Sequence, residues 1–81
     1  MADPKLVAQG AERREAVFTF VRKHIAERGY APSIREIGEA VGVRSPAAIK
    51  VHLERLADAG LLTVAPGVAR GIALTSKGRR A

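Results

Sequence analysis

The sequence predicts a mainly α-helical domain that carries a small β-hairpin. Residues 33–60 contain two short helices with their own start and stop signals, an amphipathic stretch precedes them, and apolar residues alternate with a period of two after them. With 81 residues the chain is expected to form one domain, near the lower size limit for a core that folds unaided. It contains no cysteine, which excludes disulfides, thiolate zinc sites and cysteine nucleophiles.

The first predicted helix covers residues 11–28. We expect residues 1–10 to form a flexible N-terminal arm, because Gly10 interrupts the weak helical signal before it. Gly29 ends the helix, and residues 30–32 form an extended link, because the residue before a proline is pushed out of the helical region. The apolar side of this helix spans an arc of roughly 160° and consists of Val17, Phe18, Phe20, Val21, His24 and Ile25.

The next two helices are marked by their caps. Ser33 and Glu36 form a capping box, in which each side chain bonds the backbone N–H of the other residue. Gly42 supplies the left-handed residue that ends this helix. Ser45-Pro46 begins the third helix, with serine at the N-cap and proline at the first helical position, and Gly60 closes it. The expected inward residues are Ile34, Ile37 and Val41 in one helix, and Ile49, His52, Leu53, Leu56 and Ala57 in the other.

After Gly60 the pattern is that of a β-hairpin. Leu62 and Val64 alternate with polar or small residues, residues 65–69 carry the turn, and alternation resumes at Ile72 and Leu74. Three helices followed by a two-stranded hairpin form the winged helix-turn-helix arrangement, predicted here for residues 11–75. Residues 76–81 are expected to be a basic tail or the start of an interdomain linker.

Helices joined by so short a turn cross steeply, which is the geometry that presents the second helix to a DNA groove. The net charge of +6 favours a polyanionic partner, although residues 33–60 are neutral and the excess lies in the first helix and after Gly60. No long apolar segment and no signal-peptide pattern is seen, so we expect no membrane partner and a cytoplasmic location. Double-stranded DNA is therefore the expected partner.

The candidate DNA contacts follow from this geometry. The start of the third helix can face a phosphate, Lys50 can reach guanine or a phosphate, and small apolar side chains suit the thymine methyl group. Glu54 can accept from cytosine N4 or remain a solvated charge, and Arg35 can instead pair with Glu39. Arg70 is the candidate contact from the hairpin to the DNA backbone or minor groove. The complete set is Arg35, Arg44, Ser45, Ala47, Ala48, Lys50, Val51, Glu54 and Arg70.

Several of these residues also have a purely structural interpretation. Ala47 and Ala48 can be simply good helix formers, and the basic residues of the first helix a solvated face. His24 and His52 have apolar neighbours at helical spacing and no second ligand nearby, so we interpret both as packing residues rather than metal ligands. We expect no metal and no cofactor.

The order of the motifs resembles one family. Residues 29–43, the Arg44-Ser45-Pro46 turn, His52-Leu53, Gly60-Leu61-Leu62 and residues 69–74 together resemble the LexA family of SOS repressors, over about residues 14–74. The resemblance implies a repressor that binds the palindromic operators of DNA-damage-response genes as a homodimer in the bacterial cytoplasm, associated with the nucleoid. It also implies that a full-length parent has a C-terminal domain that dimerises and cuts its own chain with a serine–lysine dyad when a RecA filament activates it.

This sequence departs from the best-known members at the recognition surface. Enterobacterial members carry Asn and Glu at the positions matching Ala47, Lys50 and Val51, so the operator sequence stays open. Adjacent Ser76-Lys77 cannot form a held, desolvated dyad, and neither paired carboxylates nor a phosphate-binding glycine loop is present, so we expect no enzymatic activity from this chain. The rival hypotheses are a winged-helix protein-interaction module and a stand-alone regulator unrelated to SOS.

Overall fold

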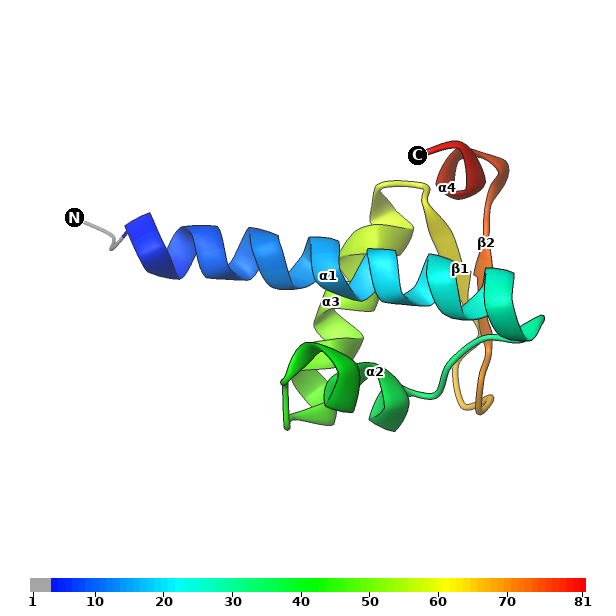
Figure 1. Cartoon of the computed structure of the whole chain (residues 1–81), viewed down its shortest axis with the longest axis horizontal. Coiled ribbons are helices and arrows are strands. Elements are labelled where there is room, and N and C mark those ends of the chain that lie inside the picture. The colour runs from blue at the N-terminus through cyan, green and yellow to red at the C-terminus, as the bar shows by residue number, and fades with distance from the viewer. Residues whose placement is uncertain (1–3) are drawn as a thin grey trace.

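The computed structural model describes the backbone of residues 4–81 and the side chains of residues 10–81. Along this part of the chain the elements are α1 (Pro4–Arg28), α2 (Ile34–Val41), α3 (Pro46–Asp58), β1 (Leu62–Val64), β2 (Ile72–Leu74) and α4 (Ser76–Arg80). Long α1 crosses the domain and its N-terminal half projects beyond it, while the hairpin lies at the opposite end (Figure 1). The prediction of a mainly helical domain with one antiparallel hairpin is confirmed.

Helix α1 begins earlier than the sequence predicted. It starts at Pro4 and continues through Gly10, so the expected beginning near Ala11 is wrong. A single glycine costs a helix interior only about 1 kcal/mol, which flanking helix-forming residues offset. Residues 1–3 of the predicted arm lie outside the described residues, and the mobility of residues 1–10 stays a prediction.

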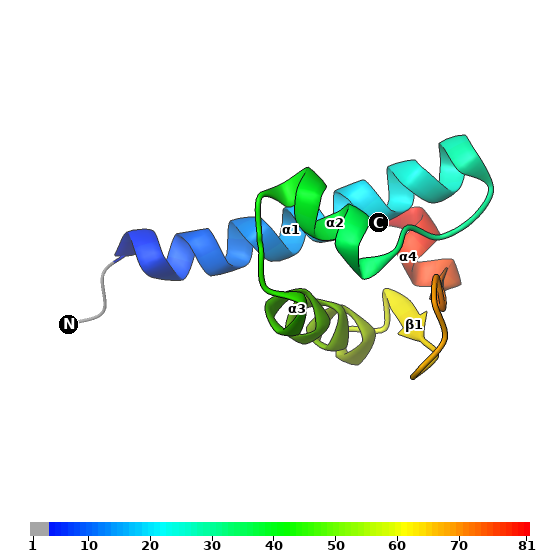
Figure 2. The same cartoon turned by 90° about the horizontal axis from the view of Figure 1, so that it is seen from below.

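The core forms where α1, α2 and α3 meet and continues under the hairpin. In Figure 2 the α2–turn–α3 unit lies against α1, and β1 follows directly from the end of α3. β1 and β2 pair antiparallel with Leu62 opposite Leu74 and Val64 opposite Ile72. The buried apolar residues are Val17, Phe18, Val21, Ala31, Ile37, Val43, Ile49, Leu53, Leu56, Leu62 and Ile72. The other apolar residues that the helical and strand periods selected are only partly buried, namely Phe20, Ile25, Ile34, Val41, Ala57 and Leu74, and Val64 is exposed.

The predicted caps are present. Ser33 Oγ accepts from the N–H of Glu36 at 3.1 Å, and Glu36 Oε1 accepts from the N–H of Ser33 at 2.9 Å. Gly42 ends α2 in the left-handed conformation, at φ 75°. Helix α3 ends at Asp58, and Gly60 follows at φ 78°, with its N–H bonded to Ala57 and the next N–H bonded to Leu56. This paired pattern is a Schellman cap.

The predicted tail is instead a short helix packed on the domain. Thr75 Oγ1 caps α4 by accepting from the N–H of Gly78 at 3.0 Å, and Lys77 Nζ donates to the carbonyl of Ala59 at 2.9 Å. Gly78 lies against the backbone of Leu61, closely enough that a side chain there would overlap it. The sequence pattern did not reveal this helix, because backbone and capping bonds hold it and it has no apolar side chains to show a helical period. Whether a linker begins beyond it stays a prediction.

The carboxylate of Glu36 also connects α2 to the hairpin. The N–H of Ser33 lowers its pKa most, partial burial opposes this, and the Ser33 side chain and the guanidinium of Arg70 lower it further. Together these groups bring the pKa from 4.5 to about 2. The folded domain therefore favours the ionised carboxylate more strongly than the unfolded chain does.

We predict that Gly38→Ala destabilises the domain, because a Cβ there would lie 2.7 Å from the carbonyl oxygen of Val43 in the turn between α2 and α3. Overpacking of this kind costs about 1–3 kcal/mol. The control is Gly10→Ala, whose Cβ would meet nothing within 4 Å and which should stabilise α1 by roughly 0.5–1 kcal/mol. Urea unfolding measures both, and equal effects of the two substitutions would contradict the packing argument.

The depressed pKa of Glu36 predicts an acid-sensitive stability. Below about pH 4.5 the unfolded chain takes up a proton at Glu36 that the folded domain does not accept until the pH nears 2. The free energy of unfolding should therefore fall across this window as the pH is lowered. Glu36→Gln keeps an oxygen acceptor for the capping box but cannot titrate, so its urea midpoint should fall less steeply than that of the wild type. Parallel pH profiles would rule out this origin.

Candidate nucleic-acid interface

The N-terminal end of α3 is exposed and rigidly capped. Ser45 Oγ accepts from the N–H of Ala48 at 3.3 Å, and Pro46 has no N–H to offer. Among the described residues none bonds the N–H of Ala47, so this group is available to an anion at the positive end of the helix dipole. Arg44 lies exposed in the turn directly before the cap.

The outer face of α3 carries the expected side chains. Ala47, Lys50 and Glu54 are exposed, and Val51 retains 48% of its accessible surface. Ala48 is half-buried and packs against the core, so it is the least accessible of the predicted base contacts. On α2, Arg35 Nε lies 3.3 Å from Glu39 Oε1, which confirms the expected i,i+4 pair.

Four of the predicted residues line a groove between α3 and the hairpin of residues 62–74, called the wing below. The groove has a volume of about 750 Å³ and runs along the N-terminal end of α2 as well. Arg35, Lys50, Glu54 and Arg70 all line it, although they come from three separate segments of the chain. The sequence did not predict its apolar wall, in which Val64 of β1 is 40% exposed and Val68 of the turn 59% exposed.

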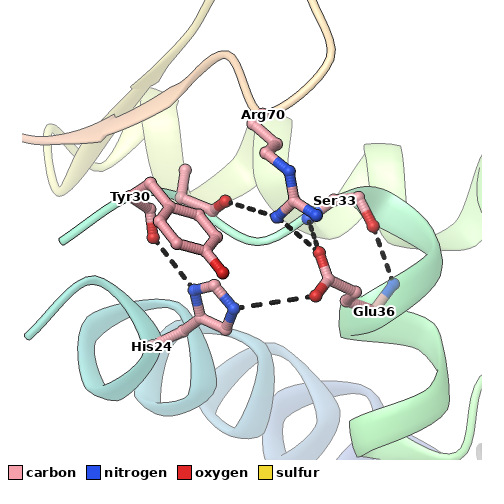
Figure 3. A network of polar contacts seen from close by, with 6 residues as sticks. His24, Tyr30, Ser33, Glu36 and Arg70 are labelled. Atoms are coloured by element: carbon pink, nitrogen blue, oxygen red, sulfur yellow. Dashed lines mark hydrogen bonds and ion pairs between the residues drawn. The ribbon is translucent and has the colours of Figure 1, made fainter. Parts of the chain in front are cut away.

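The side chain of Arg70 points into the domain rather than away from it (Figure 3). Its Nη1 lies 2.6 Å from Glu36 Oε1 and donates to the carbonyl oxygen of Ala31 at 3.0 Å. Its guanidinium also lies over the ring of Tyr30, 5.0 Å from the centroid, in a cation–π arrangement. Arg70 is therefore already bonded to the α1–α2 link and to α2, and these bonds compete with the predicted DNA contact.

His24 extends this network into α1. Its Nδ1 donates to the carbonyl oxygen of Tyr30 at 2.9 Å, and its Nε2 lies 3.7 Å from Glu36 Oε2 (Figure 3). The ring is buried, as its helical spacing predicted, and it takes part in a polar network as well as in packing. Sequence reasoning missed the network because Glu36 and Arg70 are 34 residues apart and only the fold of the wing brings them together. The capping box was the only local signal for Glu36.

His52 is half-buried against α1, as its spacing predicted. Its Nδ1 has no hydrogen-bond partner among the described residues. Burial lowers its pKa, and the nearby charges of Arg14 and Arg13 lower it further, so the neutral ring is favoured. None of the helices within residues 4–81 combines the length and apolar character needed to cross a membrane.

Comparison with known proteins identifies the family. The model of the LexA DNA binding domain matches residues 9–71. The LexA repressor of Brevibacillus brevis is 44% identical over 66 residues, which are 82% of this chain and 32% of the relative. LexA repressor 2 of Pseudomonas syringae pv. tomato is 45% identical over 62 residues, 76% of this chain and 31% of the relative. The chain thus spans about a third of the length of these curated relatives. It belongs to the family of LexA DNA-binding domains.

Proposed function

We propose that this domain binds operator DNA sequence-specifically, as the DNA-binding part of a LexA-type SOS repressor. Helix α3 enters the major groove, and the wing lies on the adjacent backbone or minor groove. The observation that carries the proposal is the groove that Lys50 and Glu54 of α3 line together with Arg35 and the wing. The exposed, capped start of α3 precedes these residues on the same helix. No carboxylate lies between Ala40 and Leu53, so no acidic side chain within this part of the chain repels phosphates.

Phosphate contacts and base contacts fall to different residues in this proposal. Arg44 and the N-terminal end of α3 at Ser45 contact the phosphates of the DNA backbone. Arg35 adds a further phosphate contact once its pairing with Glu39 is broken. Lys50 and Val51 contact base edges from the outer face of α3, with the methyl group of Ala47 beside them. Ala48 and Glu54 lie at the edge of this base-contacting surface, since Ala48 packs inward and Glu54 is one turn further along α3.

One observation favours the rival function of a protein-interaction module. The exposed Val64 and Val68 give the groove an apolar wall, which a partner protein could cover. This rival predicts binding that depends little on salt. Groove docking on DNA with four to six phosphate contacts predicts a log–log salt slope of about −3.6 to −5.4, from ~0.9 per contact.

The functions of a longer parent belong to the same proposal. The relatives are about two and a half times as long as this chain and are named repressors. We propose that such a parent dimerises on palindromic operators, acts in the bacterial cytoplasm on the nucleoid, and carries a C-terminal serine–lysine protease domain activated by a RecA filament. These activities are proposed for the longer parent and not for residues 1–81 alone.

The test is selection of binding sites from a randomised DNA pool with a dimerised form of this chain, followed by titration of the selected duplex at several salt concentrations. A recurrent half-site and a slope in the stated range would support the proposal. Binding without sequence preference, or a slope near zero, would contradict it.

We predict that Lys50→Ala and Val51→Ala change which duplex is selected, because both side chains face base edges. A lost specific contact is worth about 1–3 kcal/mol of discrimination at one position. Arg44→Ala, as a comparison, should weaken binding to all sequences alike and make the salt slope less steep by about 0.9. If Lys50→Ala weakened all sequences equally, Lys50 would be a phosphate contact and not a base contact.

A further inference from the structure

We propose that Arg70 is a positioning residue, which holds the wing against α2 so that the wing and α3 meet DNA in one fixed arrangement. The inference rests on the proposed DNA binding and deepens it. In this role Arg70 acts by binding Glu36 and does not itself contact a phosphate or the minor groove.

The contacts of Arg70 all face the body of the domain. Its Nη1 serves both Glu36 Oε1, at 2.6 Å, and the carbonyl oxygen of Ala31, at 3.0 Å, and Tyr30 covers one side of the guanidinium. The side chain is 43% exposed, so water reaches it, but its described polar partners lie inside. Any movement of the guanidinium away from α2 toward DNA would break the charge-assisted bond that Nη1 makes to Glu36.

The backbone at Arg70 supports the same role. Its φ is 59°, the one positive value among the non-glycine residues that the structure describes. This left-handed conformation is uncommon for a residue with a Cβ, and Arg70 adopts it where the turn returns to β2. Gly71 follows in a bend so tight that a Cβ would lie 2.9 Å from the carbonyl oxygens of Ala65 and Val68. The bend directs Arg70 toward α2.

The wing needs such a hold because its own pairing is short. β1 and β2 have three residues each, and a two-stranded hairpin of this size is marginal by itself. Buried Leu62 and capping Thr75 fix the end near α3, and buried Ile72 anchors β2 in the core, whereas residues 65–69 of the turn are small or apolar and exposed. Arg70 is the only charged residue between Gly60 and Lys77. Its side-chain bonds therefore join the turn end of the wing to α2 and to the α1–α2 link.

A positioning role and a direct contact predict opposite effects of Glu36→Gln. This substitution retains Arg70 and a capping-box acceptor but removes the charge that holds the guanidinium. If Arg70 positions the wing, affinity for the duplex selected by the wild type should fall about fivefold or more, a typical coupling magnitude. If Arg70 contacts DNA, removing a carboxylate and releasing an arginine should leave affinity equal or higher, and the inference is overturned.

The matched control is Glu39→Gln on the same helix. It removes one carboxylate and releases Arg35, but Glu39 has no bond to the wing. Its affinity should equal or exceed that of the wild type. If Glu36→Gln and Glu39→Gln have the same effect, the loss of a charge explains both and Arg70 has no positioning role.

Arg70→Gln provides a second readout through the salt slope. Loss of a positioning residue should lower affinity about fivefold or more with the slope unchanged, since no phosphate contact disappears. A slope less steep by about 0.9 would show a direct phosphate contact instead and contradict the inference. Circular dichroism at the assay temperature separates both results from unfolding.

The hold on the wing is also measurable without DNA, so its failure is distinct from failure of DNA binding. Backbone order parameters from ¹⁵N relaxation at residues 66–69 should fall in Arg70→Gln from about 0.85 toward 0.6 or below, while those of α3 stay constant. Unchanged values in the turn would overturn the inference even if the wild type binds its selected duplex tightly.

Discussion

The carboxylate of Glu36 joins three parts of this domain that no other single group connects within the described residues. It accepts from the N–H of Ser33 at the start of α2, pairs with Arg70 of the wing and lies 3.7 Å from His24 Nε2 on α1. We propose that this carboxylate, together with buried Leu62 and Ile72, holds the wing relative to the helices and so shapes the groove between α3 and the wing. In this proposal the geometry of the groove is sensitive to the charge at Glu36.

The apolar core supplies the complementary constraint by fixing α3. Ile49 and Leu53 are nearly inaccessible and pack with Val17 and Ile37 of the other two helices. With its inner side held in this way, α3 can present only its outer side, where Lys50 and Val51 lie. In the proposed mode of binding, buried apolar contacts and the Glu36 network place the elements, and exposed side chains of α3 contact the bases.

Local signals in the sequence predicted the helices and their caps well. Serine, proline and glycine at the ends of α2 and α3 act through neighbouring backbone groups, so their effect can be read from adjacent residues. The extent of α1 through Gly10 was missed because a helix tolerates a single glycine, and the helix of residues 76–80 was missed because backbone and capping bonds form it. The Glu36–Arg70 pair had no local signal, because 34 residues separate the two, and Arg70 was predicted only as a basic residue on an exposed hairpin.

We propose that DNA is bound by the outer face of α3 together with the wing turn. Backbone ¹H–¹⁵N chemical shifts, mapped as the selected duplex is added to the labelled domain, locate the bound surface. The largest changes should cluster at residues 44–54 and 65–70, with little change along the exposed side of α1 at residues 11–16. Changes concentrated on α1, or spread evenly over the basic residues of the whole domain, would contradict it.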